Sequence, residues 1–102
     1  MEKQLNKSIL ITGCSTGIGA ALVAEFLRQG FLVFGSIRDK KMEVPLKKKY
    51  GDNFVPLLFD VTNYAQISNA YKKVKSTLKG ANLGILINNA GIAKLRSERA
   101  HV

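Results

Sequence analysis

Residues 12–19 read Thr12-Gly13-Cys14-Ser15-Thr16-Gly17-Ile18-Gly19 and separate two runs of different pattern. The run before them, 9–11, is apolar like a buried strand, and the run after them, 20–28, is amphipathic like a helix. Glycines let the backbone come close to a ligand, and the first turn of a helix stabilises a phosphate through its unpaired N–H groups. The stretch therefore predicts a phosphate-binding turn. The alternative is a plain strand-to-helix turn that needs glycine only for its shape.

The alternation of apolar and amphipathic runs continues along the chain. We predict strands over 8–12, 31–37, 54–59 and 83–88, and helices over 17–29, 39–50 and 63–79. Pro45 predicts that the second helix is short or broken, and Pro56 predicts an edge position for the third strand. Strands that alternate with helices predict an α/β fold, a Rossmann-type doubly wound parallel sheet with strand order 3-2-1-4.

Two helices carry apolar stripes that we expect to be buried against this sheet. The stripe of the first helix contains Ile18, Ala21, Leu22, Phe26 and Leu27. The stripe of the last helix contains Ile67, Tyr71, Val74 and Leu78.

Composition predicts one small globular domain, because the chain has 102 residues of which 46% are hydrophobic. Its single cysteine, Cys14, excludes an internal disulfide and fits a reducing compartment. Residues 1–7 are polar and do not resemble a signal peptide. No apolar run approaches the ~18 residues that span a bilayer. We therefore expect a soluble, cytoplasmic protein that does not associate with a membrane.

The formal net charge is +9, which raises the question of an anionic partner. The lysines of 72–79 alternate with apolar residues at helical spacing, which is typical of the solvated face of an amphipathic helix. No interleaving of aromatic and basic residues or nucleic-acid-binding motif is present. We therefore expect no nucleic-acid partner.

Three motifs in order give the chain a family resemblance. The glycines Gly13, Gly17 and Gly19 are spaced G-x-x-x-G-x-G, Asp60-Val61-Thr62 follows the third apolar run, and Asn88-Asn89-Ala90-Gly91 follows the fourth. From Ser8 to about Ile92 the chain resembles the short-chain dehydrogenase/reductase family. The resemblance implies that 1–102 is a single partial dinucleotide-binding domain, truncated to about four strands, with the catalytic half absent.

The resemblance also implies which residues bind the cofactor. They are Gly13, Cys14, Ser15, Thr16, Gly17, Ile18 and Gly19 in the turn, then Arg38, Asp60, Val61, Asn89, Ala90 and Gly91. Asp60 and Val61 would contact the adenine, Asn88 would brace the sheet, and Asn89, Ala90 and Gly91 would line the ribose and pyrophosphate.

The end of the second predicted strand bears on the choice of cofactor. An acidic residue there would bind a ribose 2′-hydroxyl, but the position holds Ile37, followed by Arg38, whose guanidinium suits a phosphate. We therefore expect NADP rather than NAD. The alternative is that Arg38 is a surface arginine paired with Asp39.

The family's catalytic residues have no counterpart at the expected place in this sequence. The family uses a serine and a Tyr-x-x-x-Lys pair located after the Asn-Asn-Ala-Gly motif, and here only eleven residues follow Gly91. Tyr71 and Lys75 match that string but precede Asn88, and we interpret Tyr71 as a core residue. The lone His101 and the absence of clustered ligands predict no metal site.

Two classes of function therefore stay open. One is the NADP-binding portion of a reductase that acts on a carbonyl or alcohol and is inactive by itself. The other is a non-catalytic nucleotide-binding or interaction module, or a truncated reading frame without independent function. In either case the uncovered edge of the fourth strand predicts possible self-association.

Overall fold

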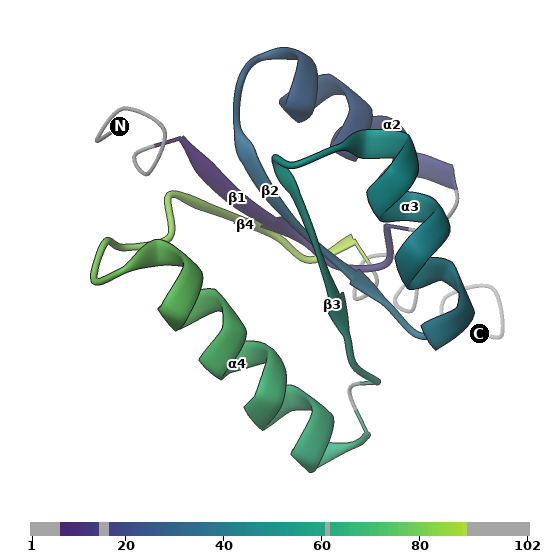
Figure 1. The fold of residues 1–102 in the computed structure, drawn as a ribbon, viewed down its shortest axis with the longest axis vertical. Helices are drawn as coiled ribbons and strands as arrows, with labels where there is room; N and C mark the ends of the chain where they lie inside the picture. The colour runs from purple at the N-terminus through teal and green to yellow at the C-terminus, as the bar shows by residue number, and fades with distance from the viewer. Residues whose placement is uncertain (1–6, 15–16, 61, 90–102) are drawn as a thin grey trace, which may run out of the picture.

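The computed structural model describes residues 7–14, 17–60 and 62–89. The described elements are β1 (Ser8–Ile11), α2 (Gly17–Arg28), β2 (Leu32–Ile37), the 3-10 turn η1 (Lys40–Met42), α3 (Glu43–Tyr50), β3 (Phe54–Leu58), α4 (Tyr64–Leu78) and β4 (Ile85–Ile87) (Figure 1). The predicted order of strands and helices is therefore confirmed, with element ends that differ by one or two residues. No helix among these residues is long and apolar enough to cross a membrane.

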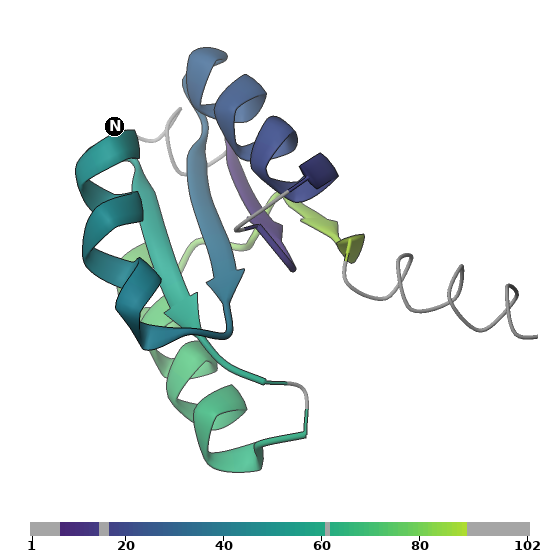
Figure 2. The ribbon, with the colours of Figure 1, turned by 90° about the vertical axis from the view of Figure 1, so that its right-hand side faces the viewer.

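The four strands form one parallel sheet in the order β3-β2-β1-β4, as predicted. Ile9 pairs with Val33 of β2 on one side and with Ile85 of β4 on the other. The arrowheads of β1, β2 and β3 point the same way in Figure 2. The carboxyl ends of all four strands consequently lie along one edge of the sheet, which is where an open α/β sheet binds ligands.

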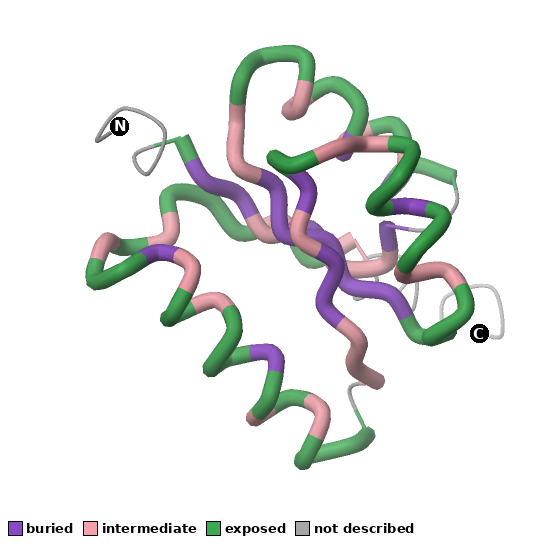
Figure 3. Tube along the Cα trace, in the orientation of Figure 1, coloured by how far each residue is buried: buried purple, intermediate pink, exposed green. Residues whose placement is uncertain are grey.

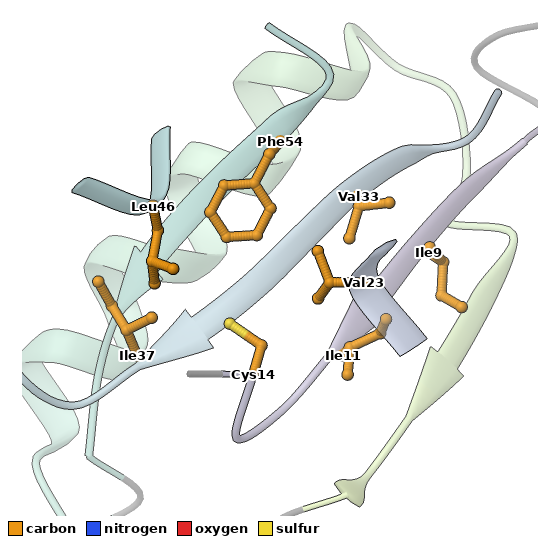
Figure 4. Packing of buried hydrophobic residues seen from close by; sticks show 8 residues of the cluster. All are labelled: Ile9, Ile11, Cys14, Val23, Val33, Ile37, Leu46 and Phe54. Atoms are coloured by element: carbon orange, nitrogen blue, oxygen red, sulfur yellow. The ribbon is translucent and has the colours of Figure 1, made fainter. Parts of the chain in front are cut away.

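Helices cover the sheet unequally on its two faces. In Figure 1, α2 and α3 lie on one side of the sheet and α4 on the other. The core under α2 and α3 contains eight buried residues, which Figure 4 shows: Ile9, Ile11, Cys14, Val23, Val33, Ile37, Leu46 and Phe54. The core under α4 has four: Phe34, Leu57, Ala70 and Leu78. Because both faces of β2 are covered, its burial is nearly continuous along the strand (Figure 3).

The predicted buried stripes are partly wrong. In α2, Ile18 is 58% exposed and Ala21 is also exposed, whereas Val23, outside the predicted stripe, is fully buried. In α4, Ile67 is 37% exposed and Tyr71 is 62% exposed, so Tyr71 is not a core residue. Helical periodicity identifies the apolar side of a helix, but the extent of the neighbouring surface decides how much of that side is covered.

Both prolines lie where their missing N–H costs little. Pro45 lies in the first turn of α3, where amide groups have no intrahelical partner, so the second helical region consists of a 3-10 turn followed by a short helix. Pro56 lies in β3, at the edge of the sheet, as predicted. Two lysines cover this edge strand: Lys47 Nζ donates to the Phe54 carbonyl at 2.7 Å, and Lys73 Nζ donates to the Pro56 carbonyl at 2.8 Å. Part of the basic charge thus protects an edge strand.

The opposite edge of the sheet is less protected. In β4, Ile85 is 40% exposed and Leu86 is 63% exposed. An apolar groove of about 500 Å³ lies beside α4 and includes Leu10, Leu83 and Tyr71 in its lining. The face under α4 is therefore only partly covered in the part of the chain that the structure describes.

Candidate functional site

The predicted site residues come together at the carboxyl edge of the sheet. The glycine turn follows β1, Arg38 follows β2, Asp60 lies just beyond β3, and Asn88 and Asn89 follow β4. This placement follows from the parallel topology, because every strand ends at the same edge. Ser15, Thr16, Val61, Ala90 and Gly91, which were also predicted to bind the cofactor, lie outside the described residues.

The glycine turn depends on backbone conformations that other residues seldom adopt. Gly13 has φ +64° and Gly17 has φ +62°. A Cβ on Gly17 would meet nothing within 4 Å, so the space beside the Gly17 α-carbon, at the start of α2, is open. The first amide groups of a helix have no intrahelical partner and carry a partial positive charge. The start of α2 can therefore accept an anionic group.

Ser36 holds the first part of this turn in place. The Gly13 amide donates to Ser36 Oγ at 2.9 Å, and the Cys14 amide donates to the Ser36 carbonyl at 3.1 Å. These two amides point to β2 and are already bonded, so the groups available to a phosphate lie farther along, at the start of α2. Sequence analysis did not identify Ser36. Its signal is a hydroxyl in the otherwise apolar 31–37 run, since a buried polar group needs a partner.

Gly19 provides the close contact between α2 and the turn. A Cβ there would lie 2.0 Å from the Gly13 carbonyl oxygen and 2.9 Å from Asn89 Nδ2. Asn89 Nδ2 itself donates to that Gly13 carbonyl at 3.0 Å. Next to it, Thr12 Oγ1 donates to Asn88 Oδ1 at 3.1 Å. Both asparagines thus brace the turn against the end of β4, whereas the prediction was that Asn88 braces the sheet and that Asn89 lines the cofactor.

Cys14 contributes to the core and not to an exposed binding surface. Its side chain is fully buried, and its thiol donates to the Ser36 carbonyl at 3.2 Å. Figure 4 shows its sulfur among the apolar residues under α2 and α3. Burial raises the pKa of the Cys14 thiol to about 11, so it is a neutral thiol near pH 7. These features indicate a packing residue and not a nucleophile.

Arg38 and Asp60 are paired with each other. Arg38 Nη2 lies 3.1 Å from Asp60 Oδ2, and the side chains are 79% and 32% exposed. The alternative pairing of Arg38 with Asp39 is not observed. Asp39 Oδ1 instead accepts from the Lys41 amide and begins the 3-10 turn. The predicted phosphate ligand and the predicted adenine ligand are therefore direct neighbours.

Asp60 also belongs to the connection between β3 and α4. Its Oδ1 accepts from the Thr62 amide at 2.9 Å and from the Thr62 hydroxyl at 2.8 Å. These bonds from Thr62, followed by the contact with Arg38, hold the pKa of the Asp60 carboxyl below its usual range. Gln66 Oε1 accepts from the Asp60 amide at 2.8 Å, and Asn63 Oδ1 accepts from the Gln66 amide, which begins α4. Asp60 is therefore ionised at neutral pH and held in a defined orientation.

The described residues outside this edge add no catalytic or metal site. Lys75 Nζ lies 5.5 Å from the centre of the Tyr71 ring, but both residues are on α4 beside the apolar groove. No group of three or more histidine, cysteine, aspartate or glutamate side chains among the described residues could hold a metal ion.

Comparison with known proteins gives consistent matches. Residues 7–101 match the short chain dehydrogenase family. The chain is 39% identical over 85 residues to the NADPH-dependent 3-dehydrocapnine reductase of Ornithobacterium rhinotracheale, covering 83% of this chain and 30% of that protein. It is 34% identical over 93 residues to the NADP-dependent 3-hydroxy acid dehydrogenase YdfG of Escherichia coli K12, covering 91% of this chain and 36% of that protein.

Solved structures agree with these matches. A short chain dehydrogenase from Bacillus anthracis superposes with a TM-score of 0.70 at 25% identity, covering 84% of this chain and 35% of that chain. The 3-ketoacyl-(acyl-carrier-protein) reductase of Brucella melitensis, solved with NADH, superposes with a TM-score of 0.68 at 26% identity, covering 78% of this chain and 32% of that one. This chain thus spans about a third of the length of these relatives.

Proposed function

The chain belongs to the short chain dehydrogenase family, and on that premise we propose that it supplies the NADP(H)-binding portion of an oxidoreductase acting on a carbonyl or alcohol. The observation that carries this proposal is the open start of α2 beside Gly13 and Gly17, at the carboxyl edge of a parallel sheet. The names of two relatives state NADPH or NADP dependence, which supports the cofactor class.

In this proposal the cofactor's pyrophosphate binds at the start of α2, at the amides of Gly17, Ile18 and Gly19 and at Ser15 and Thr16 before them. The open space beside Gly17 supports a close approach of the phosphates. Ile18 is 58% exposed at this edge, so it can lie against a bound ligand. Asn89, Ala90 and Gly91 line the ribose and pyrophosphate, and Gly13 and Cys14 shape the turn beneath them.

The adenosine end of the cofactor lies across the ends of β2 and β3 in this proposal. Asp60 and Val61 contact the adenine, and Arg38 binds the 2′-phosphate. The 79% exposure of the Arg38 side chain supports its access to a phosphate. The Brucella reductase was solved with NADH, so the preference for NADP rests on Arg38 and on the names of the relatives.

The bound nicotinamide would supply or accept the hydride. Residues of this chain would bind and orient the adenosine and pyrophosphate parts of the cofactor. The pair with the family's Tyr-x-x-x-Lys spacing, Tyr71 and Lys75, lies on α4 beside the apolar groove and not at the carboxyl edge where the cofactor would bind. We therefore propose that residues 1–102, tested by themselves, bind the cofactor without turning over a substrate.

Titration calorimetry with NADP and NAD tests the cofactor proposal. Gly19→Val should abolish binding of both, because its side chain would collide with Gly13 and Asn89. Arg38→Ala should weaken NADP binding at least several-fold, since a hydrogen bond to a charged group is worth ~1.5–3 kcal/mol. It should leave NAD binding nearly unchanged. Equal losses for both cofactors would show that Arg38 does not bind the 2′-phosphate, and unchanged binding in Gly19→Val would overturn the assignment of the turn.

We also propose that two copies associate through the edge of β4. The exposure of Ile85 and Leu86 on this edge strand supports pairing of β4 with a second copy. Leu86→Lys should shift the 102-residue chain toward monomer in sedimentation velocity. The surface variant Val44→Lys, 73% exposed on α3, is the matched control. A wild-type chain that stays monomeric up to high concentration would contradict this proposal.

A further inference from the structure

Arg38 has a defined partner at the carboxyl edge of the sheet. Its Nη2 donates to Asp60 Oδ2 at 3.1 Å, across the ends of two neighbouring strands. The proposed function assigns these two side chains to two parts of one ligand, the 2′-phosphate and the adenine. The interaction of Arg38 or Asp60 with the ligand therefore depends on whether the contact between these two side chains is kept or broken.

Asp60 is the fixed partner of this pair. Two bonds from Thr62 occupy its Oδ1, and Gln66 holds its main-chain amide. Its Oδ2, the oxygen that Thr62 does not bind, is the one that Arg38 contacts. An adenine amino group that approaches this carboxylate would meet the oxygen already bonded to Arg38.

Arg38 is the mobile partner, because its side chain is 79% exposed and makes one contact with Asp60 through one of its five N–H groups. A 2′-phosphate bound to this guanidinium would bring about two negative charges next to the ionised Asp60. Like charges at such a distance repel, and the repulsion is only partly screened at physiological salt. Sharing the guanidinium between both anions is therefore less favourable than exchanging one for the other.

We propose that Asp60 competes with the cofactor's 2′-phosphate for Arg38, so that the Arg38–Asp60 ion pair persists with NAD and opens by exchange of partners with NADP. This inference rests on the proposed function. NADP exchanges Asp60 for a new anion on Arg38, whereas NAD brings no 2′-phosphate and leaves the Arg38–Asp60 contact in place. The ion pair thus contributes to cofactor specificity, because competition by Asp60 reduces the affinity that NADP gains from the Arg38–phosphate interaction.

The test is the ratio of the NAD and NADP dissociation constants, measured by titration calorimetry for wild type and variants. Asp60→Asn keeps an oxygen for Thr62 but removes the charge that holds Arg38. Its loss of adenine binding affects both cofactors and cancels in the ratio, as would a general loss of structure. Because an exposed ion pair contributes only modestly, the ratio should rise about 1.5- to 5-fold in favour of NADP.

Two controls make the result specific. Asp39→Asn removes an equal charge next to Arg38 that does not contact it, and it should leave the ratio within error of wild type. In an Arg38→Ala background, Asp60→Asn should change the ratio much less than in wild type, because the guanidinium for which the two anions compete is absent and only the direct repulsion of the phosphate by Asp60 remains. If Asp39→Asn raises the ratio of dissociation constants as much as Asp60→Asn does, the effect comes from net charge alone, and the proposed competition is overturned.

The remaining outcomes separate this inference from the function on which it rests. If wild type binds NADP better than NAD but Asp60→Asn lowers the ratio, Asp60 positions Arg38 and does not compete for it, and the inference is overturned alone. An unchanged ratio overturns it in the same way. If wild type binds neither cofactor, the proposed function fails and the inference fails with it.

Discussion

Replacing Gly19 with alanine tests the close contact between α2 and the glycine turn. This contact and helix propensity predict opposite changes in the free energy of unfolding. Alanine in a helix is normally favoured over glycine by ~0.8–1.0 kcal/mol. In this fold, however, the new Cβ would lie 2.0 Å from the Gly13 carbonyl oxygen and 2.9 Å from Asn89 Nδ2. The first of these obstacles is main chain, so α2 must move away from the turn.

The magnitude follows from three contributions. Overpacking against an obstacle that cannot rotate away costs up to ~3 kcal/mol. Disturbing the 3.0 Å bond from Asn89 to the Gly13 carbonyl costs ~1 kcal/mol. Helix propensity returns ~1 kcal/mol. The free energy of unfolding should therefore fall by about 3 kcal/mol, which for a domain of this size lowers Tm by roughly 12–24 °C.

Thermal unfolding followed by circular dichroism measures this change. Gly17→Ala is the matched control in the same helix, since its Cβ would meet nothing within 4 Å and its cost is only the ~1–2 kcal/mol of a left-handed conformation. Gly19→Ala should be non-additive with Asn89→Ala, whereas Gly17→Ala should be additive with it. A Gly19→Ala variant that melts at or above the wild-type temperature would refute the close contact of α2 with the turn.

Three further predictions concern the same edge and the groove. Ser36→Ala should lower the free energy of unfolding by ~1–3 kcal/mol in urea titrations, because the Gly13 amide loses its acceptor; an unchanged midpoint would contradict the anchoring role. Because the Cys14 pKa is raised from 9.0 to about 11, the folded state holds this proton more tightly than the unfolded state, so stability should decline as pH rises from 9 to 11. Cys14→Ala should show less of this decline, and an identical pH profile would argue against the shift. Finally, the 102-residue chain should not oxidise NADPH with aldehydes, ketones or quinones, and turnover lost in Tyr71→Phe would overturn the proposal that it lacks a proton donor.

Sequence periodicity was sufficient for the order and type of the elements. The strands and helices are encoded by neighbouring residues, and their alternation predicts a parallel sheet. The order β3-β2-β1-β4 is the doubly wound order that was predicted for such a sheet. The carboxyl-edge location of the glycine turn, Arg38, Asp60 and the two asparagines follows from that topology. The effects of Pro45 and Pro56 were likewise predictable, because a missing N–H acts at its own position.

Side-chain exposure was less predictable than element type. Ile18 and Tyr71 lie on apolar sides of their helices, yet both are exposed, because burial depends on what lies opposite each residue. Under α4 the sheet leaves a groove where the pattern of the helix implies a filled contact. Periodicity describes one helix by itself, whereas the burial of its side chains also depends on the surface that packs against it.

The sequence by itself determined the chain's parallel α/β architecture and the edge at which its motif residues gather, since both follow from local patterns and from the direction of the strands. Only the tertiary structure decided the partners within that edge. In sequence, Ser36 is 23 residues from Gly13, whose amide donates to its hydroxyl. Asp60 is 22 residues from Arg38, and Asn89 is 76 residues from Gly13. Such hydrogen bonds and ion pairs form between side chains that only the packed sheet brings within reach, so no local pattern in the chain encodes them.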